Sequence, residues 1–130
     1  MKTVVLLYDS SCIYEIVILN YFLKVTGKDV VFVSPDGGTI TAMEGYSIHT
    51  AGALIQINPS DVELLIVPGG DITPIDKEDV WNYLRLVNQN HGLIAGICAG
   101  VDVLEHADLL DGIDSTHSTD LDVVVCDNII

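Results

Sequence analysis

Short, uninterrupted apolar runs alternate along this chain with longer amphipathic stretches, and this alternation constrains the fold more than any other feature. Apolar runs are typical of parallel strands buried on both faces, and the stretches between them are typical of crossover helices. We therefore expect an α/β fold whose parallel sheet is covered on both sides. The predicted strands, all rich in aliphatic or β-branched residues, are residues 3–8, 29–33, 63–67, 93–97 and 123–126.

The helices are predicted from the spacing of apolar residues and from residues typical of helix ends. The first is expected at residues 13–26, where Gly27 supplies a C-terminal cap. The second is expected at residues 77–90, and a third helical pattern covers residues 101–107. The stretch between the second and third strands is less regular and predicts only short extended pieces, at residues 39–43 and 46–49.

The length of the chain, 130 residues with 49% hydrophobic content, is enough to bury one hydrophobic core. The sequence contains no internal repeat, low-complexity tract or linker composition. We therefore expect residues 1–130 to form a single domain.

Charge and cysteine content limit the partners and the compartment. The formal net charge of −14 would repel phosphate backbones and anionic membrane surfaces, so neither nucleic acid nor membrane is expected as a partner. The apolar N-terminal run is too short for a signal peptide, and no stretch is long enough to span a membrane. The 3 cysteines lack metal-ligand or paired-disulfide spacing, which favours a soluble protein of the reducing cytoplasm.

The residues that follow the strands are the first place to search for a site, because ligands of parallel α/β sheets collect outside the carboxyl ends of the strands. Three such places contain polar or glycine-rich sequence. They are residues 9–15 after the first strand, the PGG sequence at residues 68–70 after the third, and Cys98 after the fourth.

Cys98 lies in the sequence GICAG at residues 96–100, where an apolar strand leads directly into a helical pattern. Flanking glycines relieve crowding at a tight turn, as in a nucleophile elbow, where the side chain stands exposed above the sheet. The N-terminus of the following helix would favour the thiolate form. The alternative interpretation is a small buried cysteine in a glycine-rich turn.

The PGG and GICAG sequences, together with the strands that precede them, resemble the ThiJ/PfpI superfamily over nearly the whole chain. The resemblance implies a class I glutamine amidotransferase-like fold, that is, a flavodoxin-like three-layer sandwich with a mainly parallel sheet and a cysteine nucleophile elbow. Members usually continue into a further turn and a long C-terminal helix, for which the given sequence has no counterpart. Either the protein is shortened or incompletely represented, or a partner chain covers the sheet face that the helix would protect. An apolar sheet face left uncovered favours self-association. Since members are commonly homodimers, we expect a homodimer.

The resemblance also implies roles for particular residues. Cys98 is the nucleophile, Glu15 matches the acidic residue that approaches its sulfur, and His117 matches a histidine that many members place beside the cysteine. The backbone N–H groups of Gly70 and Ala99 would form an oxyanion hole. The supporting turn residues are Gly69, Gly96 and Gly100.

Plainer interpretations exist for the remaining candidates. Glu15 can be a solvated acid in a first helical turn, although its neighbours are apolar, and His117 can be a surface loop histidine. Cys12 is interpreted as a spare loop thiol and Cys126 as a core residue. The other histidines lack ligand spacing with one another or with the cysteines, so we expect no metal and no cofactor.

The leading functional hypothesis is a cofactor-independent, cysteine-dependent enzyme that acts on a small electrophile. The resemblance implies a hydrolase or lyase, with glyoxalase or deglycase chemistry, isonitrile hydration and amide hydrolysis as the possible reactions. The alternative is a redox-sensing or binding protein in which Cys98 is oxidised without turnover.

Overall fold

The computed structural model covers all 130 residues and centres on a four-stranded parallel sheet with strand order β2-β1-β5-β6. If the four sheet strands are numbered 1 to 4 by their order in the sequence, their order across the sheet is 2-1-3-4. This is the strand order of flavodoxin-like doubly wound sheets. Each pair of neighbours is in parallel register, for example Val4 beside both Val31 and Leu65. The bounds of the four strands are β1 (Lys2–Leu6), β2 (Val30–Val33), β5 (Val62–Val67) and β6 (Leu93–Gly96).

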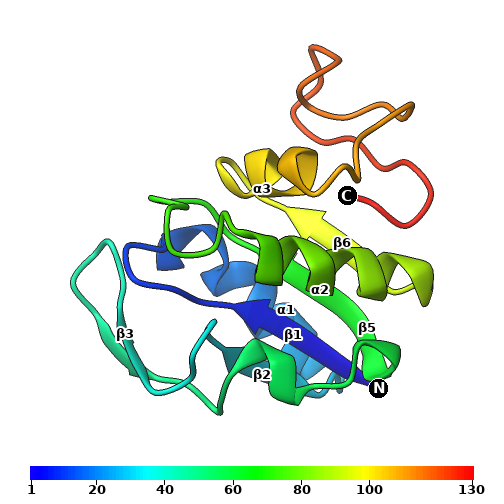
Figure 1. The fold of residues 1–130 in the computed structure, drawn as a ribbon. Coiled ribbons are helices and arrows are strands. Elements are labelled where there is room, and N and C mark those ends of the chain that lie inside the picture. Colours follow the sequence, from blue (N-terminus) through cyan, green and yellow to red (C-terminus); the bar gives the residue numbers. More distant parts are fainter.

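Helices cover both faces of this sheet, as Figure 1 shows, with α1 behind it and α2 and α3 in front. Their bounds are α1 (Val17–Val25), α2 (Glu78–Gln89) and α3 (Gly100–His106). A separate antiparallel hairpin, β3 (Thr39–Thr41) and β4 (Ser47–His49), follows β2. Short 3₁₀ turns complete the elements, namely η1 (Ile13–Glu15), η2 (Leu54–Gln56) and η3 (Pro59–Asp61).

Alternate residues of β1 build the two hydrophobic layers. Val4 and Leu6 belong to the larger cluster, which includes apolar residues of α2 and α3. Val5 belongs to a smaller cluster with Ile16 and residues of the β3–β4 hairpin. Successive side chains of a strand point to opposite faces, so an uninterrupted apolar run supplies both layers at once. The predicted α/β class, with a mainly parallel sheet, is confirmed.

The prediction of a fifth strand is wrong, because residues 123–126 do not form a strand. Val123 and Val125 are exposed, and the free edge of β6 is paired instead by the last residues of the chain. Ile94 N–H donates to the Asn128 carbonyl at 2.9 Å, and Ile130 N–H donates to the Ile94 carbonyl at 2.8 Å. Valines favour strands, but a strand forms only where an edge is available to pair with it.

Helix α1 is the least buried of the three helices, since none of its residues is fully buried. Ile18 is 73% exposed and Phe22 57% exposed. Exposed large apolar side chains grouped on one helix mark a surface suited to contact with another protein.

No helix of the structure combines the length and the apolar character needed to cross a membrane.

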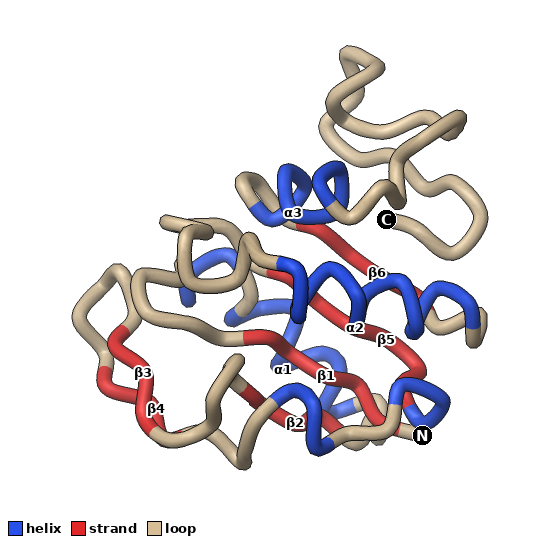
Figure 2. Tube along the Cα trace, viewed as in Figure 1, coloured by secondary structure: helices blue, strands red, loops and turns tan.

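A polar contact joins the loop before α2 to the end of α3. The Asp76 carboxylate accepts a hydrogen bond from Trp81 Nε1 at 2.9 Å and lies 2.8 Å from His106 Nδ1. The segment that follows α3, residues 107–130, contains no helix or strand and lies beside α3 (Figures 1 and 2).

Candidate functional site

The loops that follow β1, β5 and β6 meet at the carboxyl edge of the sheet. Ser11 and Gly70 form an isolated antiparallel bridge, and Cys12 N–H donates to the Gly69 carbonyl at 2.8 Å. Ile97 N–H donates to the Val67 carbonyl at 3.0 Å, which ties the loop after β6 to the end of β5. The site therefore forms around the point where strand order reverses, between β1 and β5.

Cys98 has the backbone geometry of an elbow. Its φ of 53° lies in the left-handed region, which is uncommon for a residue with a Cβ, and its side chain is exposed. Gly100 is required by close approach, because a Cβ there would overlap the Val67 carbonyl oxygen. Gly96 packs against the side chain of Leu104. The sequence thus turns sharply from β6 into α3 and leaves the thiol at the outside of the turn.

Glu15 reaches this turn from η1, and Gly69 is the point where the two meet. One oxygen of the carboxylate, Oε2, accepts a hydrogen bond from Gly69 N–H at 3.3 Å. A Cβ at position 69 would lie 2.9 Å from Glu15 Oε1 and 3.0 Å from the Cβ of Cys98. Because both groups lie within 3.0 Å of the same point, the structure brings Glu15, Gly69 and Cys98 together.

Glu44, from the turn between β3 and β4, holds the short helix that carries Glu15. Its carboxylate accepts hydrogen bonds from Tyr14 N–H at 2.8 Å and Ile13 N–H at 3.1 Å. These backbone donors, Tyr14 first, hold the pKa of Glu44 below its ordinary value. Sequence reasoning missed Glu44, because nothing in the local pattern shows that the hairpin folds back onto η1.

Tyr8 holds the loop of residues 68–70 through a side-chain hydrogen bond. Its hydroxyl is buried and donates to the Pro68 carbonyl at 2.6 Å. Burial, and next the charge of Glu15, raise the pKa of Tyr8 well above its ordinary value, so the phenol stays a hydrogen-bond donor. Sequence reasoning placed Tyr8 in a strand and missed this contact, although a tyrosine at the end of a buried strand is a signal for one.

The backbone N–H groups of Gly70 and Ala99 lie on the loops that meet at Cys98. Neither donates one of the hydrogen bonds between backbone groups of the chain. A buried or half-buried amide without a partner is uncommon, and such donors beside a nucleophile are suited to bind an oxyanion.

The two other cysteines differ from Cys98 in exposure. Cys12 is buried beside the sulfur of Met43, and burial, followed by the neighbouring Glu15, raises the pKa of its thiol to about 11. Cys126 is half-buried in the segment after α3, so its prediction as a core residue is wrong. It lies outside the core because the strand predicted for it does not form.

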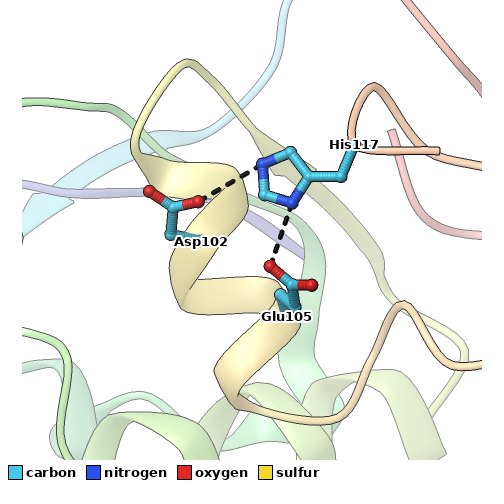
Figure 3. A group of neighbouring side chains, drawn as sticks. All are labelled: Asp102, Glu105 and His117. Carbon is cyan, nitrogen blue, oxygen red and sulfur yellow. Dashed lines mark hydrogen bonds and ion pairs between the residues drawn. The ribbon is translucent and has the colours of Figure 1, made fainter. Parts of the chain in front are cut away.

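His117 does not join the group around Gly69. Its Nδ1 lies 3.0 Å from Glu105 Oε2 and its Nε2 lies 3.3 Å from Asp102 Oδ1, so both ring nitrogens face carboxylates of α3 (Figure 3). One ligand atom from each of the three residues lies within 4.8 Å of the others, the spacing of a group able to hold a metal ion.

A mostly apolar cavity of about 480 Å³ lies between the elbow and the segment after α3. Cys98 and Val101 line it on one side, and residues 114–116 and 121–124 line it on the other. A cavity of this size and character accommodates a small organic molecule with limited charge.

The chain is similar in sequence and in fold to known proteins. A model of the DJ-1/PfpI family matches residues 1–126. A deglycase of Pyrococcus abyssi is 26% identical over 115 residues, which are 86% of this chain and 69% of the deglycase. The HTH-type transcriptional regulator CdhR of Pseudomonas aeruginosa is 34% identical over 80 residues, which are 62% of this chain and 24% of the regulator.

The structure of a DJ-1 superfamily protein from Agrobacterium tumefaciens is similar in fold, with a TM-score of 0.78 at 23% identity. The similarity covers 86% of this chain and 61% of the Agrobacterium protein. The chain therefore spans less than two thirds of the length of that protein.

Proposed function

Because the chain belongs to the DJ-1/PfpI family, as its resemblance to ThiJ/PfpI proteins predicted, we propose that it is a cofactor-independent cysteine enzyme acting on a small electrophile. The observation that carries the proposal is that an exposed Cys98 and the Glu15 carboxylate both lie within 3.0 Å of the position that a Cβ of residue 69 would take. A nucleophile with an acid or base within reach is the minimal equipment for covalent catalysis.

The first chemical step is addition of the thiol to the electrophile. For an aldehyde or a 1,2-dicarbonyl, the sulfur of Cys98 donates an electron pair to the carbonyl carbon, and the C=O π pair moves onto oxygen. The N–H groups of Gly70 and Ala99 hold that oxygen while charge develops on it. Glu15 carries the thiol proton to the oxygen, which leaves a neutral hemithioacetal on Cys98.

His117 is not needed for the proposed addition step. Many ThiJ/PfpI proteins place a histidine beside the cysteine, and a catalytic role for His117 stays a prediction. Because both ring nitrogens of His117 lie against Asp102 and Glu105, His117 has no part in the proposed proton transfer, which uses Cys98 and Glu15.

The apolar cavity beside Cys98 favours a small substrate of low charge. The net charge of −14 disfavours anionic substrates for the same reason that it disfavours nucleic acid. Among the reactions of the family, these properties suit dicarbonyl, glycated amine and isonitrile substrates better than acidic peptides.

The test is turnover of methylglyoxal and of an alkyl isonitrile by the wild-type chain, with Cys98→Ser and Glu15→Gln beside it. We expect loss of one of the two substrates that depends on Cys98 and slows in Glu15→Gln. If neither substrate disappears faster with wild type than with Cys98→Ser, the proposal for these substrate classes is wrong.

A second candidate, a redox-sensing or binding protein, is favoured by the match to CdhR, a transcriptional regulator. In this alternative peroxide oxidises the thiol of Cys98 to a sulfenic acid and is reduced to water. A small thiol then condenses with the sulfenic acid, releasing water, and a second thiol frees Cys98 from the mixed disulfide as the small-molecule disulfide leaves. Reversible oxidation of Cys98 together with no turnover of either substrate would favour the sensor over the enzyme.

We propose the reducing cytoplasm as the location of this protein, because its cysteines are free.

We also propose that the chain forms a homodimer through α1. Tyr21, Phe22 and Val25 are each more than half exposed on this helix, and burial against a second copy would remove them from water. Sedimentation at micromolar concentration should show a dimer that Phe22→Glu converts to monomer. A monomeric wild type would refute this assembly.

A further inference from the structure

The side chains of Asp102, Glu105 and His117 form a cluster that the proposed chemistry at Cys98 does not use. Asp102 and Glu105 are three residues apart on α3, so their carboxylates lie on the same face of the helix. His117 approaches this face from the segment after α3, and its imidazole lies between the two carboxylates (Figure 3).

We propose that these three residues bind a divalent transition-metal ion, with Zn²⁺ as the representative. Imidazole nitrogen and carboxylate oxygen are both established ligand types for Zn²⁺, with bonds of about 2.0–2.2 Å. Tetrahedral bonds of that length place ligand atoms about 3.4 Å apart. The cluster has ligand atoms within 4.8 Å of one another, with contacts of 3.0 and 3.3 Å already present. A small rotation of exposed side chains completes the approach.

The local charge favours a cation at this place. Neither Asp102 nor Glu105 forms an ion pair with a lysine or arginine, and His117 is the partner of both. Arg85, on α2, pairs instead with Glu78 and Asp108. Two carboxylates without a lysine or arginine partner, in a chain of net charge −14, attract a divalent cation more strongly than they attract a single imidazole.

The donor set also selects among cations. Mg²⁺ and Ca²⁺ prefer oxygen ligands and take a nitrogen ligand poorly, whereas imidazole suits Zn²⁺, Co²⁺ and Ni²⁺. With three protein ligands, a fourth position is left for water. We therefore expect Zn²⁺ and Co²⁺ to bind and Mg²⁺ to compete weakly.

Metal at this cluster would fix the segment that forms one wall of the cavity beside Cys98. His117 is held locally by its N–H, which donates to Ser115 Oγ at 3.1 Å, and residues 114–116 line the cavity. A metal bond from His117 to α3 would therefore link this wall to the helix that begins at the elbow. The proposal concerns the cluster itself and does not depend on turnover at Cys98.

The test is calorimetric titration with ZnCl₂ of the chain carrying Cys98→Ser, which removes the exposed thiol as a competing ligand. In this background we compare His117→Ala, Glu105→Gln and Asp102→Asn. The matched control is His106→Ala, because His106 lies on the same helix but faces a single carboxylate, that of Asp76. Circular dichroism checks that each variant is folded.

We expect one Zn²⁺ per chain, with affinity reduced at least about tenfold in each of the three variants and retained in His106→Ala. Zn²⁺ should also slow proteolysis within residues 107–130, and excess Mg²⁺ should not displace it. Absence of Zn²⁺ binding at millimolar concentration, or equal affinity in all variants, would overturn the proposal.

Discussion

The loops around Gly69 meet at the elbow and the cluster around His117 lies on the helix that follows it, yet different forces build these two regions. Around Gly69, backbone hydrogen bonds and close approaches fix the positions, since Cys12 N–H and Gly69 N–H both take part. Around His117, the contacts are ion pairs between side chains that are 33% to 56% exposed. Backbone contacts tolerate almost no displacement, whereas exposed ion pairs contribute little and can rearrange.

The comparison teaches where this molecule is rigid and where it can be adjusted. Cys98 and its acidic neighbour Glu15 belong to the rigid part, in which the ends of neighbouring strands hold each loop. The cavity wall formed by residues 114–116 belongs to the adjustable part, which contains no regular element. Variants in the first region should therefore change chemistry, and variants in the second should change it little.

The largest difference is expected among the cysteines. Iodoacetamide at pH 8 should label Cys98 first and Cys12 last, because Cys98 is exposed while Cys12 is buried with a pKa of about 11. The thiolate is the reactive form, so labelling of Cys12 should rise about tenfold per pH unit until the pH reaches its pKa. Peptide mass mapping over time measures both rates, and early labelling of Cys12 would contradict the arrangement.

Gly69→Ala should reduce turnover and Cys98 labelling by about 10²-fold or more. Its Cβ would meet Glu15 Oε1, the backbone nitrogen of Ala99 and the Cβ of Cys98, and a displacement of about 1 Å is enough for such a loss. The matched control is Gly112→Ala in the segment after α3, where a Cβ would meet nothing within 4 Å. Because Gly112 has a φ of 74°, the control should lower stability but leave the reactivity of Cys98 near wild type.

Tyr8→Phe should lower the free energy of unfolding by about 1–3 kcal/mol, since it leaves the buried Pro68 carbonyl without its donor. Turnover should fall with it, because the loop of residues 68–70 loses its support. Urea denaturation followed by circular dichroism gives the first quantity. A variant as stable as wild type would show that water replaces the phenol and that Tyr8 does not position the loop.

Glu44→Gln should lower the melting temperature at pH 7 and make less difference at acidic pH. The pKa of Glu44 is lowered in the folded protein below its ordinary 4.5, so its carboxylate stabilises the fold above that pH. This stabilisation is lost as the pH falls through the lowered pKa. Melting curves of wild type and variant should therefore converge below pH 4.5, and a gap that is constant with pH would refute the role of the charge.

The smallest effect is expected for His117→Ala. With its ring nitrogens against Asp102 and Glu105, its removal should change methylglyoxal turnover by well under the roughly 10²-fold that loss of a general base costs. Initial rates at saturating substrate measure the change. A loss of two or more orders of magnitude would show that His117 moves to the cysteine during the reaction.

Much of this arrangement was predictable from local sequence. The four sheet strands, the three helices and the hairpin strands all lie within a few residues of the predicted ranges. The prediction of a strand at residues 123–126 is wrong. The edge of β6 is paired by Asn128 and Ile130, so the valines of this run have no strand beside them to pair with. Glu44 and Tyr8 were missed because their partners, Tyr14 and Pro68, lie 30 and 60 residues away.

The sequence by itself determined the alternation of strands and helices and the turn at Cys98, because apolar periodicity and flanking glycines act over a few residues. The resemblance to ThiJ/PfpI proteins predicted Glu15 beside that cysteine, although no local pattern shows it, and only the tertiary structure placed His117 between Asp102 and Glu105. The physical reason is that the carboxyl ends of parallel strands meet at one edge of the sheet. The segment after α3, which has no regular element, is positioned by backbone hydrogen bonds to β6 and by the contacts of His117 with α3. Distances between residues far apart in the chain are fixed by that packing and by no local pattern.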